Sequence, residues 1–114
     1  MLNDGPLTIE RKEGKNPGTR VFCLSGPLTL RNLFEIQSEL RNSEPSPMTV
    51  IDLTGVPYMD SAGMGLVMNT YVRCQTRGVK LVVAGANSRV MDLFKVTKVD
   101  MVLPLVGTVD EADA

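Results

Sequence analysis

The chain has 114 residues, of which 43% are hydrophobic and 22% are charged, and its formal net charge is −1. This size predicts one compact domain over residues 1–114, and the interspersed charges give no basic field that would attract nucleic acid or anionic lipid. The absence of histidine removes the commonest general base and the usual zinc ligand, so we expect no enzymatic activity, no metal and no cofactor.

The first six residues have neither the basic nor the apolar region of a signal peptide, and no apolar run reaches the length of a membrane span. We therefore expect a soluble, cytoplasmic protein without membrane insertion. Cys23 and Cys74 lie in apolar surroundings in the sequence, which favours two buried thiols over a disulfide.

The first half of the chain predicts a β-hairpin followed by a helix. Residues 7–11 and 19–25 read as strands, and the turn formers between them indicate an antiparallel hairpin with a long loop. Thr29 is a suitable N-cap for a helix from Leu30 to about Asn42. The apolar stripe of this helix is expected at Leu30, Leu33, Ile36 and Leu40.

The stretch from Val50 to Cys74 organises the rest of the chain. After a breaker at 43–47, residues 48–53 form an apolar, β-branched run that is typical of a central parallel strand covered on both faces. Asp60 or Ser61 is then the expected N-cap of a long amphipathic helix. At about 100° per residue, its core face should hold Met64, Val67, Met68, Tyr71 and Cys74. Its solvent face should hold Ala62, Leu66, Asn69 and Arg73.

The remaining segments predict a buried strand at 80–85, a short helix capped by Asn87 or Ser88, and an edge strand at 102–106. Residues 108–114 would begin another helix but are too few to make it stable alone. The order of elements predicts an α/β fold. Its mixed sheet should have about five strands, an N-terminal antiparallel hairpin plus parallel strands, with helices packed on it.

The corner at Asp60 and Ser61 should lie at the carboxyl end of the central strand, where open α/β sheets place their sites. A hydroxyl at a helix N-terminus, next to an exposed Leu66 and a Gly65 that permits close approach, would make a docking surface. Ser61 could instead be only an N-cap. Asp52 could be either a buried, hydrogen-bonded carboxylate or a support for the switch loop.

The run from Val50 to Leu66, VIDLTGVPYMDSAGMGL, resembles the signature of the STAS domain in stand-alone bacterial anti-sigma factor antagonists. In that family a strand of the form V-x-D-L-S/T-x-V precedes D-S-S/T-G-x-G at the start of a helix. The similarity runs from about Leu7 to Val109, which would be the core of the domain. Ala62 departs from the usual second Ser or Thr and leaves Ser61 as the acceptor, and Thr29 stands where the family often has Asp.

The resemblance implies a STAS fold and a switch in which an anti-sigma factor, itself a serine kinase, binds the protein and phosphorylates Ser61, which turns binding off. A serine phosphatase would reset it, and we expect a monomer or weak dimer that binds no nucleic acid. The expected partner-binding residues are Asp60, Ser61, Ala62, Gly65, Leu66, Asn69 and Arg73, with Asp52 and Thr29 supporting the switch loop.

Two other functions compete with this one. The chain could be a constitutive STAS scaffold in a signalling or lipid-transport complex, in which Ser61 is never modified. A serine hydrolase is disfavoured because the chain has no histidine and no glycine two positions before Ser61. Nucleotide binding is also disfavoured, because Gly63 and Gly65 belong to neither a P-loop nor a dinucleotide fingerprint.

Overall fold

The computed structural model describes residues 6–42 and 46–113, except for the side chains of Glu35 and Asn42. The expected breaker at 43–47 therefore lies partly outside the described residues. The elements in chain order are β1 (Thr8–Glu13), β2 (Thr19–Ser25), α1 (Phe34–Asn42), β3 (Met48–Gly55), α2 (Ser61–Thr76), β4 (Lys80–Ala84), α3 (Ser88–Val96), the 3₁₀ helix η1 (Val99–Met101), β5 (Leu105–Val106) and α4 (Val109–Ala112).

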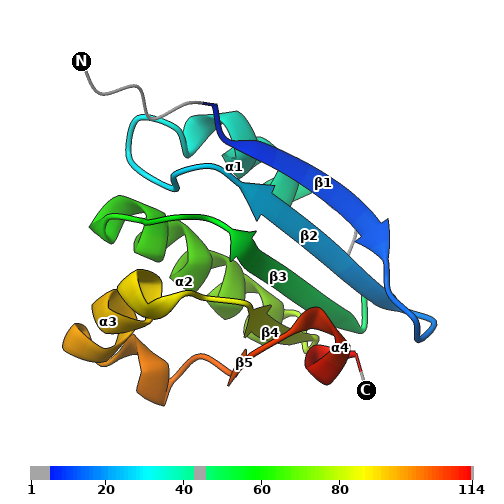
Figure 1. Cartoon of the computed structure of the whole chain (residues 1–114). Coiled ribbons are helices and arrows are strands. Elements are labelled where there is room, and N and C mark those ends of the chain that lie inside the picture. The colour runs from blue at the N-terminus through cyan, green and yellow to red at the C-terminus, as the bar shows by residue number, and fades with distance from the viewer. Residues whose placement is uncertain (1–5, 43–45, 114) are drawn as a thin grey trace.

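The five strands form one mixed sheet in the order β1-β2-β3-β4-β5 (Figure 1). β1 pairs antiparallel with β2, and every later pair is parallel. Val21, Val50 and Val82 lie opposite one another across β2, β3 and β4. The predicted mixed sheet, its N-terminal hairpin and the central position of β3 are confirmed.

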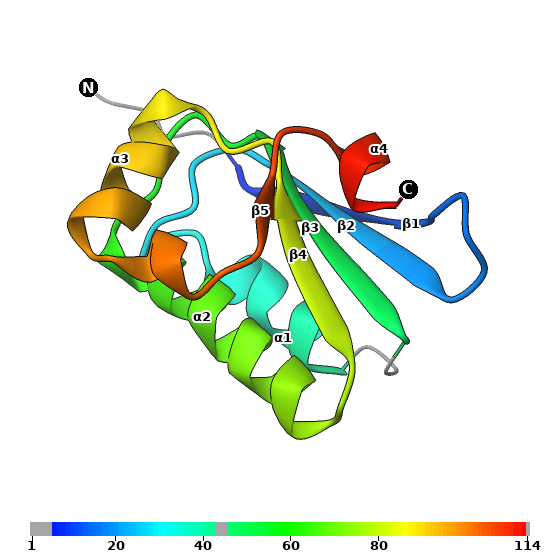
Figure 2. The ribbon, with the colours of Figure 1, turned by 90° about the horizontal axis from the view of Figure 1, so that it is seen from below.

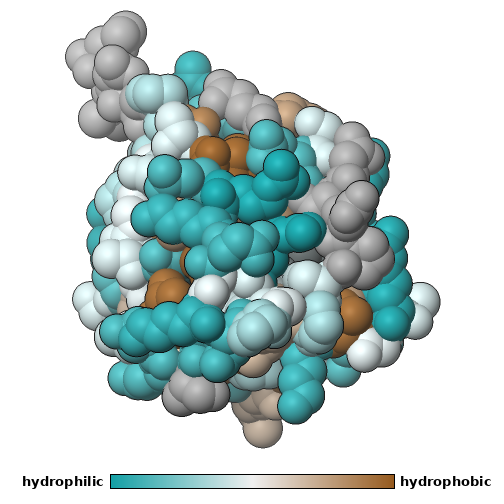
Figure 3. Space-filling view, turned by 90° about the vertical axis from the view of Figure 1, so that its right-hand side faces the viewer, coloured by the Kyte–Doolittle hydropathy of each residue, from teal (hydrophilic) through white to brown (hydrophobic). Residues whose placement is uncertain are grey.

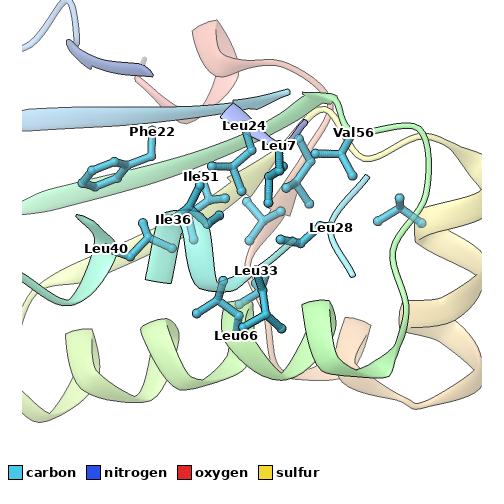
Figure 4. Close-up of a cluster of buried hydrophobic side chains, with 14 of the residues drawn as sticks. Leu7, Phe22, Leu24, Leu28, Leu33, Ile36, Leu40, Ile51, Val56 and Leu66 are labelled. Atoms are coloured by element: carbon cyan, nitrogen blue, oxygen red, sulfur yellow. The ribbon is translucent and has the colours of Figure 1, made fainter. Parts of the chain in front are cut away.

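The two faces of the sheet are covered unequally. α1 and α2 lie on one face, and the single turn of α4 lies on the other (Figure 2). Because alternate strand residues point to opposite faces, a strand buried on both sides reads as a continuous apolar run. Ile51 of β3 joins the main core, packed with Ile36 of α1 and Leu66 of α2 (Figure 4), while Val50 faces the smaller cluster under α4.

The first helix begins later than predicted. Residues 29–33 form a turn in which the Thr29 carbonyl accepts hydrogen bonds from the N–H groups of Asn32 (3.0 Å) and Leu33 (2.8 Å), so α1 starts only at Phe34. The Thr29 hydroxyl accepts no hydrogen bond from described residues, so Thr29 is not the N-cap of a helix at Leu30. Leu30 is also not part of the buried stripe, because 58% of it is exposed, whereas the other three predicted stripe residues are buried.

The last strand is shorter than predicted. Residues 99–101 form η1 instead of leading directly into a strand, and Lys98 turns the chain between α3 and η1 with a left-handed φ of 64°. Only Leu105 and Val106 pair with β4 as a strand, although the carbonyl of Pro104 accepts the N–H of Val83 at 2.9 Å. The strand does lie at the edge of the sheet, as Pro104 required.

The one-turn helix α4 is followed by Asp113, which hydrogen-bonds to the loop between β1 and β2. The carboxylate accepts hydrogen bonds from the backbone N–H groups of Lys15 and Asn16 and from the Asn16 Nδ2. Burial of the carboxylate raises its pKa, but these hydrogen bonds outweigh that effect and hold the pKa of Asp113 below its usual value of 3.8. The side of the molecule that carries the loop between β1 and β2 is mainly hydrophilic (Figure 3).

Asp113→Asn should destabilise the protein at neutral pH and have little effect in acid. A carboxyl whose pKa is lowered by folding stabilises the native state above its unfolded pKa, and this contribution is lost as the pH falls through the folded pKa. Urea unfolding at pH 7, 5 and 3 should therefore show a difference from wild type that shrinks below about pH 4. Asp110→Asn, which removes only an exposed ion pair with Lys15, is the matched control. An equal deficit at pH 3 and pH 7 would contradict this role of Asp113.

Candidate functional site

The loop after β3 ends at Asp60, whose carboxylate makes two hydrogen bonds to different segments. Its Oδ1 accepts the N–H of Gly63 at 2.9 Å, which makes Asp60, and not Ser61, the N-cap of α2. Its Oδ2 accepts the N–H of Leu30 at 3.0 Å, in the loop between β2 and α1. One side chain therefore starts α2 and binds a neighbouring loop.

The same two segments meet through their backbones. The N–H of Asp60 donates to the carbonyl of Leu28 at 3.2 Å, and the N–H of Leu28 donates to the carbonyl of Tyr58 at 3.1 Å. A Cβ on Gly63 would lie only 2.1 Å from the Leu28 carbonyl oxygen. Gly63 is thus required for the close approach of a loop to α2, and this packing explains it without any phosphate cradle.

A third loop braces the corner from the other side. Asn87 caps α3 by accepting the N–H of Val90 at 2.9 Å, and its Nδ2 donates to the carbonyl of Pro57 at 3.0 Å. The Arg89 guanidinium lies over the Tyr58 ring, 5.1 Å from its centre. The segment before Ser61 is therefore held by contacts from the loops that follow β2 and β4.

Ser61 is the first residue of α2 and is exposed. One turn later, the space beyond the Gly65 Cα is open to at least 4 Å. Asn69 is also exposed on this helix, and Arg73 is half-buried. The corner thus exposes the Ser61 hydroxyl at a helix N-terminus that hydrogen bonds hold in place. The helix surface beside it is flat, because Gly65 carries no side chain.

The predicted orientation of α2 is wrong, although Val67 is buried and Asn69 is exposed as expected. Leu66, expected on the solvent face, is only 5% exposed and packs beside Leu33 (Figure 4). Ala62 is half-buried against the same core. The buried face is Gly63, Leu66, Val67 and Thr70, rotated by about 80° from the expected one at 100° per residue.

Two contacts explain this rotation. Gly63 must face Leu28, which turns the adjacent Leu66 inward. On the other flank, Met64 packs only partly against the core, and its Sδ accepts the Thr97 hydroxyl at 3.1 Å. Met68, Tyr71 and Cys74, which were predicted as core, are likewise half-buried.

Leu66→Ala should destabilise the protein by about 2–5 kcal/mol, because it leaves a cavity between α1 and α2. Val72→Ala on the same helix, at a side chain 51% exposed, should change stability by no more than about 0.5 kcal/mol. Chemical denaturation of both variants measures this. Equal stabilities would restore the original assignment of Leu66 to the solvent face.

Gly63→Ala and Gly65→Ala should have opposite effects on stability. A methyl group on Gly63 forces the Leu28 loop away from α2 and should destabilise by about 1–3 kcal/mol. A methyl group on Gly65 meets open space and should stabilise the helix by about 0.5–1 kcal/mol. Thermal melts of the two variants suffice, and destabilisation by Gly65→Ala would show that its surroundings are crowded.

The two predicted support residues do not hydrogen-bond to the corner within the described chain. The Thr29 side-chain oxygen is buried and lacks a hydrogen-bond partner there. Asp52 accepts hydrogen bonds from the Thr54 N–H (3.0 Å) and hydroxyl (2.6 Å), on the sheet face opposite α2 and beside Cys23. Asp52 therefore shapes the end of β3, and a role in supporting the switch loop stays a prediction for both residues.

Sequence reasoning missed two exposed apolar side chains, one of them beside the corner. Leu30, whose N–H binds Asp60, is 58% exposed, and Phe34 at the start of α1 is 66% exposed. Phe34 falls outside the predicted apolar stripe of α1, and this was the one feature of the sequence that could have indicated its exposure. Leu30 adds exposed apolar surface beside the corner, and Phe34 adds it at the start of α1.

The two cysteines are free thiols with raised pKa values. Burial raises the pKa of both Cys23 and Cys74, and the nearby Asp52 carboxylate raises that of Cys23 further, so neither thiol is activated. Both thiols are half-buried rather than fully buried, and neither forms a disulfide. Among the described residues no cluster of three potential metal ligands occurs, and no helix there has the length and apolar character needed to cross a membrane.

Residues 12–112 match the family model of the STAS domain, so the chain belongs to the STAS domain family. A curated relative, the anti-sigma-B factor antagonist of Listeria monocytogenes serovar 1/2a, is 40% identical over 47 residues. That alignment covers 41% of this chain and 41% of the relative's length.

Solved structures confirm the STAS fold. An anti-sigma factor antagonist from Mycobacterium paratuberculosis superposes with a TM-score of 0.80 and 21% identity, over 97% of this chain and 93% of that chain. The Bacillus protein SpoIIAA in its phosphorylated form superposes with a TM-score of 0.70 and 16% identity, over 92% of this chain and 96% of that chain.

Proposed function

We propose that this chain is an anti-sigma factor antagonist. Its unphosphorylated form binds an anti-sigma factor and thereby releases sigma, and phosphorylation of Ser61 turns this binding off. The observation that carries the proposal is the exposed Ser61 at the first position of α2, on a corner braced by Asp60 and Asn87. The name of the Listeria relative supports it, as does the existence of SpoIIAA in a phosphorylated form.

The docking surface extends along the exposed side of α2. Ser61 and Gly65 provide its flat part, and Asn69 provides polar contacts. Leu30 and Phe34 add exposed apolar area of the kind that partner surfaces bury. Leu66 is buried and supports this surface from the core side.

Phosphate at Ser61 would act on the surface and leave the fold intact. It adds about −1.5 to −2 charges beside the Asp60 carboxylate. First-turn N–H groups of a helix lack intrahelical acceptors and favour anions, so α2 tolerates the phosphate. A partner that packs against the neutral hydroxyl would have to desolvate this charge, which opposes binding.

The kinase for Ser61 in this proposal is the anti-sigma factor itself, and a serine phosphatase reverses the modification. Ala62 offers no second hydroxyl next to Ser61. Thr29, whose chain neighbours Leu28 and Leu30 hydrogen-bond to Asp60, is buried. Ser61 is therefore the sole acceptor expected at this site.

Ser61→Asp should fold like wild type and bind the anti-sigma factor at least about tenfold more weakly, a loss of about 1.4 kcal/mol. Stability should stay within about 0.5 kcal/mol, because Asp60 remains the N-cap and an acid in the first turn suits the helix dipole. Calorimetric titration against the purified anti-sigma factor kinases of the organism, together with thermal melts, measures both.

Ser61→Ala is the matched control for this experiment. It should bind as wild type does and take up no phosphate when incubated with the kinase and ATP, as read by mass spectrometry. A folded Ser61→Asp that binds at wild-type strength would remove the switch and favour the constitutive scaffold. Phosphate on Ser61→Ala would show that another residue is the acceptor.

A further inference from the structure

A groove of about 280 Å³ runs between α1 and α2, on the side of α2 away from α3. Its apolar base comes from the buried Leu66 and from Val72. The polar lining comes from both helices and consists of Gln37, Arg41, Asn69 and Arg73. The groove therefore combines an apolar floor with two guanidinium and two amide groups.

None of the four polar side chains is paired within the described chain. Neither Arg41 nor Arg73 forms an ion pair there, and no carboxylate of a described side chain lines the groove. The side-chain amides of Gln37 and Asn69 make no hydrogen bond to described residues. Two like charges on neighbouring helices repel each other, and a carboxylate between them would relieve this repulsion.

The groove continues the surface that carries Ser61. Arg73 follows Ser61 by twelve residues, or about 18 Å along a helix, and Gly65 and Asn69 lie between them. A partner that covers Ser61 and follows α2 toward its carboxyl end reaches the groove.

We infer that this groove receives an acidic segment of the anti-sigma factor, with a carboxylate placed between Arg41 and Arg73. The inference rests on the proposed function and adds the chemistry of the partner. Guanidinium groups bind carboxylates through paired, charge-assisted hydrogen bonds, and the amides can orient the remaining oxygens. A nucleic acid phosphate would satisfy the same arginines, but nucleic acid is held by a broad basic field, which a chain of net charge −1 with interspersed charges lacks.

Charge reversal tests the inference directly. Arg41→Glu and Arg73→Glu should each weaken binding to the anti-sigma factor about tenfold, and the double variant more than either. Raising the salt from about 50 to about 300 mM should weaken wild type more than the double variant. Lys95→Glu, an exposed charge reversal on α3, is the matched control and should bind as wild type does. Arg73→Gln replaces Arg73→Glu if melts show that the latter is unfolded.

The partner side gives the complementary readout. Replacing the partner's acidic residues one at a time by Arg should reveal one that restores binding to Arg73→Glu. Folded groove variants that bind within about twofold of wild type would overturn the inference while leaving the Ser61 switch intact. Wild type that binds none of the anti-sigma factors would instead contradict the proposed function.

A probe that does not involve the anti-sigma factor distinguishes failure of the groove inference from failure of the proposed function. Titration of labelled wild type with a decaglutamate peptide should shift the side-chain amide resonances of Gln37 and Asn69, and the double variant should lose these shifts. Absence of the shifts in wild type would overturn the groove assignment. Stronger shifts with a single-stranded decanucleotide than with the peptide would overturn it in favour of a nucleic acid.

Discussion

The Asp60 carboxylate is the interaction on which the candidate site depends. Its two oxygens accept the N–H groups of Gly63 and Leu30, so one residue begins α2 and fixes the loop that leads into α1. Each bond alone would be an ordinary contribution of about 1 kcal/mol. Together they fix the position of Asp60 relative to α2 and to the loop before α1. Ser61 immediately follows Asp60 in the chain, so its position is fixed as well.

The close contact between Gly63 and Leu28 determines which side of α2 is available for a partner. It turns Leu66 into the core and leaves Ser61 and Gly65 on the outer side. One face of α2 therefore packs on the core, and the other is available to a partner. The rotation also places Asn69 and Arg73 beside α1, where they line a groove with Gln37 and Arg41. The same packing constraint thus produces both the exposed hydroxyl and the basic groove of the further inference.

Local chemistry made most of the fold and part of the site predictable. The strands, the cap of α3 at Asn87 and the corner at Asp60 and Ser61 follow from apolar runs and capping residues, which act within a few positions of the chain. The face of α2 did not follow, because α1 and α3 flank it on both sides and its half-buried methionines imitate a core stripe. The decisive contact joins residues 28 and 63, and no local pattern encodes it. The short length of β5 was likewise not predicted, because residues 99–101 form η1 after a left-handed turn at Lys98.

Because hydrogen bonds hold the corner in place, phosphorylation of Ser61 can change the surface that a partner contacts without changing the fold. The central claim is therefore that phosphate on Ser61 leaves the bonds of Asp60 in place. The most direct measurement is amide hydrogen exchange at Leu30 and Gly63, by NMR, in the protein before and after phosphorylation, with affinity for the anti-sigma factor measured on the same samples. Unchanged protection at both amides together with lost binding is the predicted result. Loss of protection at both amides when binding is lost would contradict the account, because it would mean that phosphate acts by opening the corner.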